Sequence, residues 1–274
     1  MALAFTGSLF SQVKYDTAYL NAGFLHVDNE DIPMALFTKS TRFDTIDAVF
    51  RVEPGESLHL TLYNLLDADV EVGCDLNTSP VNVPVNGHAT LQINAGTFGG
   101  YGIYAIDKEL RYYGLSTVLM VAENSLSSHI WNLRAFDTEA NNKMRGGESP
   151  NFESFTPGIF TLNTEAYEAN KMNMRGMVHG AVNDSIYITF AGSDIMKHAP
   201  HFHGYHVEIV HSNQQNHMLG WSKDSFPLKE HEVLTVLLVP HQPGMFPVHD
   251  HNLISATTNN NYPGGIMGML HIMP

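Results

Sequence analysis

The stretch His198-Ala-Pro-His201-Phe-His203-Gly-Tyr-His206 places four imidazoles within nine residues, a density that core packing does not require. A second cluster, His249-Asp250-His251, follows downstream. Side chains of a β-strand alternate between its two faces, so His201 would share a face with His203, and His249 with His251. Two adjacent strands would then aim four imidazoles at one volume.

Four convergent imidazoles indicate a metal site. Neutral imidazole is a ligand for copper, zinc, iron or nickel, and two paired His-x-His clusters in one domain are hard to obtain by chance. The competing interpretation is that these are surface or hydrogen-bonded core histidines that do not converge. Asp250 is the candidate catalytic residue of the clusters. Because alternation turns it away from its neighbours, we expect it to support the histidines or the structure, and not to be a ligand.

Composition limits the class of protein. A chain of 274 residues suits one large domain or two of ordinary size, and 43% apolar with 15% charged residues is a globular composition. The 28 acidic residues outnumber the 14 basic ones, for a formal net charge of -14. This charge argues against nucleic acid and against anionic membranes as partners.

Compartment is left open by the sequence. The single cysteine, Cys74, excludes an intrachain disulfide and does not decide the redox environment. Residues 1–10 have no basic region and their apolar run is broken by polar residues, so no signal peptide is visible. No apolar run approaches the roughly 20 residues of a membrane span. We therefore expect a soluble protein whose localisation is unknown.

Short alternating segments predict an all-β protein. Residues Ser57 to Tyr63 alternate as a half-buried strand does, and further short strands follow, separated by Asn, Gly and Pro. No segment of convincing length has the helical period. We expect the Asn-, Gly- and Glu-rich segment from Phe136 to Pro157 to be a long loop.

An internal repeat divides the chain. The matching pairs are Glu56–Leu62 with Asp184–Phe190, Gly102–Tyr104 with Gly244–Phe246, and Gly114–Met120 with Gly265–His271. The offset between the copies grows along the chain, as loop insertions would make it. One β-domain is therefore used twice, and we expect the domains to span residues 1–125 and 126–274.

The clustered histidines occur only in the second copy of the repeat. In this alignment the first copy has other residues at each position: Val70 for His198, Gly73 for His201, Asp75 for His203, Asp107 for His249 and Glu109 for His251. We therefore expect residues 1–125 to lack copper histidines and residues 126–274 to carry the metal site.

The second copy resembles the C-terminal domain of multicopper oxidases and copper nitrite reductases, which are built from repeated cupredoxin domains. The pattern H-x-x-H-x-H-G matches His198 to Gly204, and the family's H-C-H strand is similar to His249-Asp250-His251. Its turn and its closing G-M-M-G resemble Pro243-Gly244 and Gly265-Ile-Met-Gly268. The resemblance implies two tandem cupredoxin-like Greek-key β-sandwich domains.

One departure from the family pattern changes the chemistry that the resemblance implies. The central Cys of H-C-H is the thiolate of the blue type 1 copper, and here it is Asp250. Ile266 stands where the axial Met would be, so no blue site is expected. His198 occupies the remaining type 1 position and is either a metal ligand or a structural residue.

The type 2 and type 3 copper positions are all present, as His201, His203, His249 and His251. In the complete enzymes the other domain supplies further histidines, so here we expect one copper, or two close together, with open positions. The resemblance then implies a copper-dependent oxidoreductase, an oxidase or oxygenase, in which a small-molecule substrate or O2 reaches the metal directly. It also implies a homo-oligomer, with a trimer as one form, in which acidic residues of a neighbour's first domain face the site.

Two other classes of function stay open. A copper carrier or store without turnover would explain the missing electron relay and the segment Met172-Asn-Met174-Arg-Gly-Met177. A metal-free domain kept for interaction is the other. A cupin site is a weaker alternative, because Ile195 and Gln215 stand where its glycines are required.

Overall fold

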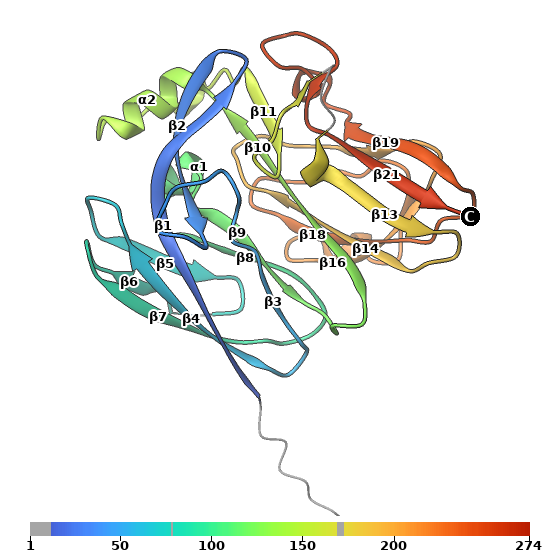
Figure 1. Cartoon of the computed structure of the whole chain (residues 1–274), viewed down its shortest axis with the longest axis horizontal. Helices are drawn as coiled ribbons and strands as arrows, with labels where there is room; N and C mark the ends of the chain where they lie inside the picture. The colour runs from blue at the N-terminus through green and yellow to red at the C-terminus, as the bar shows by residue number, and fades with distance from the viewer. Residues whose placement is uncertain (1–11, 78, 169–172) are drawn as a thin grey trace, which may run out of the picture.

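The computed structural model describes residues 12–77, 79–168 and 173–274, and nearly all regular structure in them is β (Figure 1). The strands form two β-sandwiches packed side by side, which confirms the predicted all-β, two-domain cupredoxin-like fold. The predicted boundary at residue 125 stays a prediction.

The first sandwich has two sheets. One has the order β2 (Glu30–Thr38), β1 (Val13–Val27), β4 (Ser57–Asn64), β7 (His88–Asn94). The other has the order β3 (Phe50–Val52), β9 (Ser116–Val121), β8 (Gly99–Ala105), β5 (Val70–Cys74), β6 (Val81–Val83). The alternation in β4 places Leu58, Leu60 and Leu62 in the core between them.

The second sandwich repeats this plan. One sheet has the order β11 (Ile159–Leu162), β10 (Ser127–Phe136), β14 (Ile186–Gly192), β18 (Val233–Leu238), β16 (Val207–Ser212), β17 (Ser222–Lys223). The other, here called the outer sheet, has the order β13 (Met177–Ala181), β21 (Met267–Met273), β19 (Gly244–Asp250), β15 (Pro200–Phe202). A short pair, β12 (Tyr167–Glu168) and β20 (Gly264–Gly265), lies beside them.

The strand orders support the internal repeat and correct one part of its alignment. Gly99 and Gly244 open β8 and β19 with φ of 147° and 146°, so Gly99, and not Gly102, corresponds to Gly244. In the first sandwich Tyr104 then lies opposite Gly73, as His249 lies opposite His201 in the second. Asp107 is not in a strand at all, so its predicted equivalence to His249 was wrong.

Two short helices were not predicted. They are α1 (Lys108–Tyr113) and α2 (Thr138–Arg145), and α2 lies in the segment expected to be a loop. The carboxylates of Asp107 and Asp137 accept hydrogen bonds from the first free backbone N–H groups of these helices. Single turns of 3-10 helix complete the described structure: η1 (Phe152–Ser154), η2 (Met174–Gly176), η3 (Asn216–Met218) and η4 (Leu253–Ala256). In the ranges that the structure describes, no helix has the length and apolar character needed to cross a membrane.

The sandwiches pack through the sheet that contains β14 and leave the outer sheet on the far side. Apolar residues of β9, among them Val118 and Met120, pack against Ala191 and Val233 of the second sandwich. At the edge of this contact the buried Arg134 donates to Asp47 at 2.6 Å and to the backbone oxygen of Ser116. The outer sheet therefore has one face on its own core and one face free of the first sandwich.

Candidate metal centre

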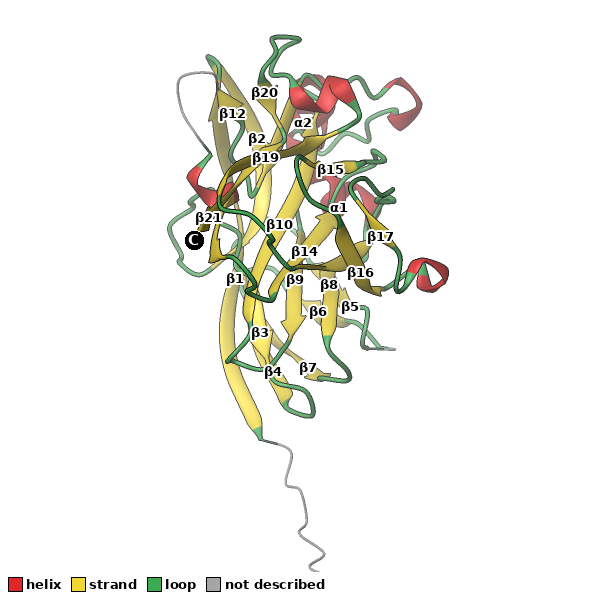
Figure 2. Cartoon of the chain, turned by 90° about the vertical axis from the view of Figure 1, so that its right-hand side faces the viewer, coloured by secondary structure: helices red, strands yellow, loops and turns green. Residues whose placement is uncertain are grey.

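The histidines are carried by two neighbouring strands of the outer sheet. β15 pairs antiparallel with β19, and His201 lies directly opposite His249. Phe202 and Val248 alternate with them and are buried in the core, so the imidazoles point outward. Figure 2 views the molecule from the side on which β19 and β21 lie.

The four rings form one group, here called the histidine cluster: His201, His203, His249 and His251. The ring centroids of His201 lie 4.9 Å from those of His203, 5.5 Å from His249 and 5.2 Å from His251. The centroids of His203 and His249 are 5.1 Å apart. The pairing predicted from the sequence thus brings all four side chains to one place on the sheet.

The closest approach is between the Nε2 atoms of His203 and His249, which are 3.0 Å apart. Two imidazoles that share an ion at about 2.0–2.1 Å have nitrogens roughly 3 Å apart, and a hydrogen bond between the rings has the same length. Across residues 12–77, 79–168 and 173–274, no three His, Cys, Asp or Glu side chains are close enough to hold a metal ion as they stand. A third ligand therefore requires His201 or His251 to change rotamer.

Hydrogen bonds occupy the Nδ1 atoms of His201 and His249, so Nε2 is the ligand atom left on each ring. Nδ1 of His249 donates to the backbone oxygen of Asp250 at 2.9 Å. Nδ1 of His201 lies 2.7 Å from the hydroxyl oxygen of Ser225. Metal-bound histidines have this arrangement, because a partner on the second ring nitrogen fixes the tautomer and the orientation of the ring.

Burial and crowding keep two of the rings uncharged. Partial burial lowers the pKa of His201 below the ordinary value, and the neighbouring His249 lowers it further. Burial, His249 and His201 lower the pKa of His203 in the same way. Neutral imidazoles present a lone pair to a cation at neutral pH. The donor set, four imidazoles of which two are held at Nδ1 by hydrogen bonds, therefore fits copper.

His198 lies elsewhere, in a buried ionic group beneath the cluster. Its Nδ1 is 2.5 Å from Oδ2 of Asp250, and its Nε2 is 3.1 Å from both carboxylate oxygens of Asp194. Burial alone would lower the pKa of His198, but the two carboxylates outweigh it and raise the pKa to about 10. His198 is therefore a charged imidazolium between two carboxylates.

Asp250 connects this ionic group to the two strands that carry the cluster. Its Oδ1 accepts from the backbone N–H of Ala199 at 2.8 Å and of Asn252 at 3.0 Å. Asp250 is fully buried and faces His198, on the opposite side of β19 from the cluster. Despite the cost of burial, its bonds to His198 hold the pKa of the carboxyl below its usual value. Oδ1 of Asp250 thus holds the backbone beside the histidines, and Oδ2 is engaged with the imidazolium of His198.

Two supporting residues were not identified from the sequence. Asp194 lies four residues before His198 in the sequence. This short spacing is the feature of the sequence that could have pointed to the pair. Ser225 reaches His201 through an isolated β-bridge that sequence spacing does not reveal. Of the Met-rich segment, Met172 lies outside the described residues.

Cys74 does not supply a thiolate ligand. It is buried in the core of the first sandwich, on β5. Burial raises the pKa of its thiol to about 12, so the group is protonated at neutral pH.

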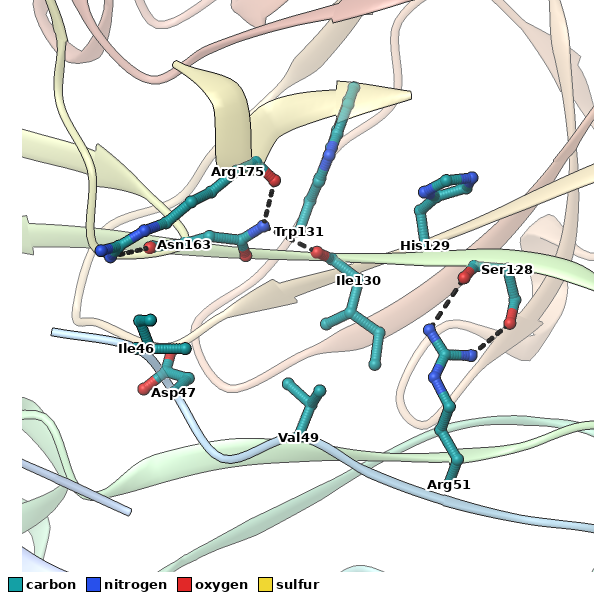
Figure 3. A pocket seen from close by; sticks show the side chains of 10 residues that line it. All are labelled: Ile46, Asp47, Val49, Arg51, Ser128, His129, Ile130, Trp131, Asn163 and Arg175. Carbon is teal, nitrogen blue, oxygen red and sulfur yellow. Dashed lines mark hydrogen bonds between the residues drawn. The ribbon is translucent and has the colours of Figure 1, made fainter. Parts of the chain in front are cut away.

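A pocket of about 250 Å³ lies between the two sandwiches (Figure 3). None of the four histidines of the cluster lines it. Its cationic side chains already have partners: Arg51 donates to Ser128, and Arg175 donates to Thr45 and Asn163. The pocket is therefore a feature of the interface between the sandwiches.

The part of the chain that carries both histidine motifs matches a known family profile. The family profile described as multicopper oxidase matches residues 135–259. A sequence search of curated proteins found no match.

Solved structures show the same fold at low identity. The blue copper oxidase of Nitrosomonas europaea is 16% identical, with a TM-score of 0.78, over 95% of this chain and 86% of that one. The copper nitrite reductase of the same organism is 10% identical, with a TM-score of 0.73, over 96% and 94%. A laccase from Botrytis aclada is 9% identical, with a TM-score of 0.70, over 95% of this chain and 53% of that one.

The solved structures show the fold of the chain, and the profile shows which family its second domain resembles. The chain has the two-domain cupredoxin fold of multicopper oxidases and copper nitrite reductases. Its second domain carries the multicopper oxidase sequence pattern, with aspartate in place of the type 1 cysteine.

Proposed function

We propose that the histidine cluster binds copper and that the protein is a copper-dependent oxidoreductase. The observation that carries the proposal is the 3.0 Å approach of the Nε2 atoms of His203 and His249, from opposite strands. His201 lies against both of these rings, and His251 lies beside His201. These four side chains would hold one copper ion or two.

Bound copper would supply a redox couple and an open coordination position. The chain contributes by orienting the ligands and by exposing them. His203 and His251 are exposed on the surface of the outer sheet, so a small molecule can reach the cluster without passing through the protein. Ser225 and the backbone of Asp250 hold the rings of His201 and His249 in a binding orientation.

The absence of a blue site decides how electrons would arrive. The type 1 position is filled by the ion pair of His198 and Asp250, which has no redox chemistry. Electrons must therefore reach the cluster directly, either from a substrate that contacts the metal or from an external donor. This favours an oxidase or oxygenase that acts on a small-molecule substrate, with O2 as the acceptor, over an enzyme that relays electrons from a distant site.

We also propose that the protein is a homo-oligomer, with a trimer as the form suggested by the family. Exposure of the cluster supports this, because a neighbouring copy could supply a further ligand there. Asp75 and Asp107 are poor ligands for that purpose. Asp75 already accepts from Gly102 and Asn213, and Asp107 caps α1. Glu109, in the first turn of α1, is the remaining acidic residue that the sequence suggested.

A copper carrier or store is the second candidate function. It is supported by the exposure of the cluster and by the small size, about 10 Å³, of a pocket that His249 and Asp250 line. Among the best-formed pockets in the described residues, the largest ones lie at the interface between the sandwiches or on the first sandwich. A metal-free interaction domain is the third candidate, and it predicts no copper binding.

Oxygen uptake distinguishes these functions. Copper-loaded protein is mixed with phenols, with reduced metal ions, or with nitrite plus a donor, and oxygen or nitrite consumption is followed. An oxidoreductase gives steady turnover that is lost in His203→Ala and retained in His217→Ala, an exposed histidine on η3. Tight binding of copper with no turnover for any substrate would identify a carrier, and no binding would identify an interaction domain.

A further inference from the structure

The outward face of the outer sheet carries histidine and methionine in register across neighbouring strands. His179 of β13 pairs with His271 of β21, and His271 pairs with Met245 of β19. Residues paired across a sheet point to the same face. These three side chains therefore form one row, here called the His/Met row.

Burial confirms which way the row points. Val178, Leu270 and Ile272 alternate with the row on β13 and β21 and are buried in the core of the second sandwich. His179 and Met245 are exposed, and His271 is half-buried. The row thus lies on the solvent side of the sheet, where Figure 1 shows β13, β21 and β19 side by side.

The two imidazoles of the row are already close enough to share an ion. Their Nδ1 atoms are 3.3 Å apart, and their ring centroids are 5.3 Å apart at 70°. Two ligands at about 2.0–2.1 Å from a tetrahedral ion have nitrogens roughly 3.3 Å apart. Because both rings can bond to water, neither needs the other as a hydrogen-bond partner.

We propose that His179 and His271, with Met245 as the third donor, form a second copper site that binds Cu(I). Two imidazoles and a thioether are borderline and soft donors, and thioethers select Cu(I) over the harder divalent ions. The formal charge of -14 on the whole chain favours the approach of any cation.

A second row of methionines connects this site to the histidine cluster. Met177 pairs with Met269, and Met269 pairs with Pro247, two residues along each strand from the His/Met row. Two residues further on, Met267 pairs with His249 of the cluster. Each step is about 7 Å along a strand. Soft donors thus extend along one sheet face from the His/Met row to the cluster, and this part of the inference rests on the proposed copper site there.

The test is a Cu(I) titration under anaerobic conditions against a chromophoric Cu(I) chelator. Wild type is compared with His179→Ala/His271→Ala, with His217→Ala as the matched control for loss of an exposed histidine. Thermal unfolding of each variant checks that it is folded. Wild type and His217→Ala should bind one more Cu(I) per chain than the double variant, and Met245→Leu should bind it about tenfold more weakly. An equal Cu(I) count in wild type and the folded double variant would overturn the proposal.

Two further measurements separate this site from the cluster. In a His201→Ala/His249→Ala background the cluster is disabled, and the Cu(I) that depends on His179 and His271 should remain. Imidazole nitrogen NMR should show Nδ1 of these two rings shifting on addition of Cu(I). Zn(II) that binds to the same rings more tightly than Cu(I) would overturn the assignment of the metal.

Discussion

Nδ1 of His198 lies 2.5 Å from Oδ2 of Asp250, and both side chains are fully buried beneath the histidine cluster. In the family that the chain resembles, these two positions hold the type 1 copper through a histidine and a cysteine. Here an ion pair joins the segment before β15 to the end of β19, and Asp194 completes it. The ion pair therefore links the two strands that carry the histidine cluster.

Removing one partner of this pair should be costly. We expect Asp250→Ala to lower the free energy of unfolding by about 3–5 kcal/mol, because it leaves a buried imidazolium with less compensation and two backbone N–H groups without an acceptor. Urea unfolding followed by fluorescence measures the change. A loss below about 1 kcal/mol would contradict the ionic description.

A double-mutant cycle checks the coupling. His198→Gln and Asp250→Asn are measured singly and together. The double variant should be more stable than the sum of the single losses predicts, by about 1–3 kcal/mol, because the neutral amides can pair with each other. Strict additivity would mean that the two residues do not interact.

The same pair predicts a loss of stability at alkaline pH. The pKa of His198 is raised to about 10 in the folded protein, against about 6.5 in an unfolded chain. The folded state then holds a proton that the unfolded state releases, so the stabilisation is complete below pH 6.5 and is lost as the pH rises through about 10. The difference in unfolding free energy between wild type and His198→Gln/Asp250→Asn should shrink across this window. A difference that stays constant would contradict the assignment.

The domain interface predicts a loss of stability in acid. The ring of His211 on β16 lies against Gly99 and 4.9 Å from Tyr101, both of the first sandwich. Burial lowers the pKa of His211 to about 4, so the folded protein keeps it neutral. Below pH 6.5 His211 is protonated in the unfolded chain but stays neutral in the folded protein. The free energy of unfolding therefore falls as the pH is lowered to about 4.

His211→Phe isolates this effect, since it keeps an aromatic ring against Gly99 and removes the titration. Between pH 7 and pH 4 the variant should lose about 1–2 kcal/mol less stability than wild type, with allowance for partial exposure. Denaturant unfolding at several pH values measures both slopes. Parallel slopes would show that His211 does not titrate in this range.

Much of the fold was predictable from strand alternation and from the repeat. Leu58, Leu60 and Leu62 alternate with polar residues, and the structure buries all three. The short helices were missed, because eight residues beginning after Asp137 carry little helical periodicity. The alignment of the two copies matched Gly244 with Gly102 when the structural equivalent is Gly99. The two glycines lie close together in the sequence, and only the positive φ of Gly99 distinguishes them.

The parts of the site that depend on local strand periodicity could be predicted from the sequence. The parts that depend on contacts between distant segments could not. The His-x-His spacing indicated which rings share a face. The partners Asp194 and Ser225 are set by loops that fold back on the sheet, and no spacing rule reports them. The row of His179, His271 and Met245 needs the strand register, because these residues are scattered through the sequence.

Orientation of the rings in the cluster should affect metal affinity. Ser225 supports His201 through its hydroxyl, so Ser225→Ala should weaken copper binding by about 10–100-fold while leaving the fold intact. Ser222→Ala, an exposed serine on β17, is the matched control. Competition with a chelator of known affinity measures both. Equal affinity in the two variants would remove Ser225 from the site.

The most direct test of the histidine cluster is the copper content and paramagnetic resonance of Cu(II)-loaded protein. Wild type is compared with His201→Ala and His249→Ala, each in the His179→Ala/His271→Ala background so that the second site does not contribute. The account predicts a nitrogen-ligated, non-blue Cu(II) signal in the background protein and its loss in both variants. An unchanged signal and copper content in folded His201→Ala and His249→Ala proteins, or an intense blue colour in any of them, would contradict it.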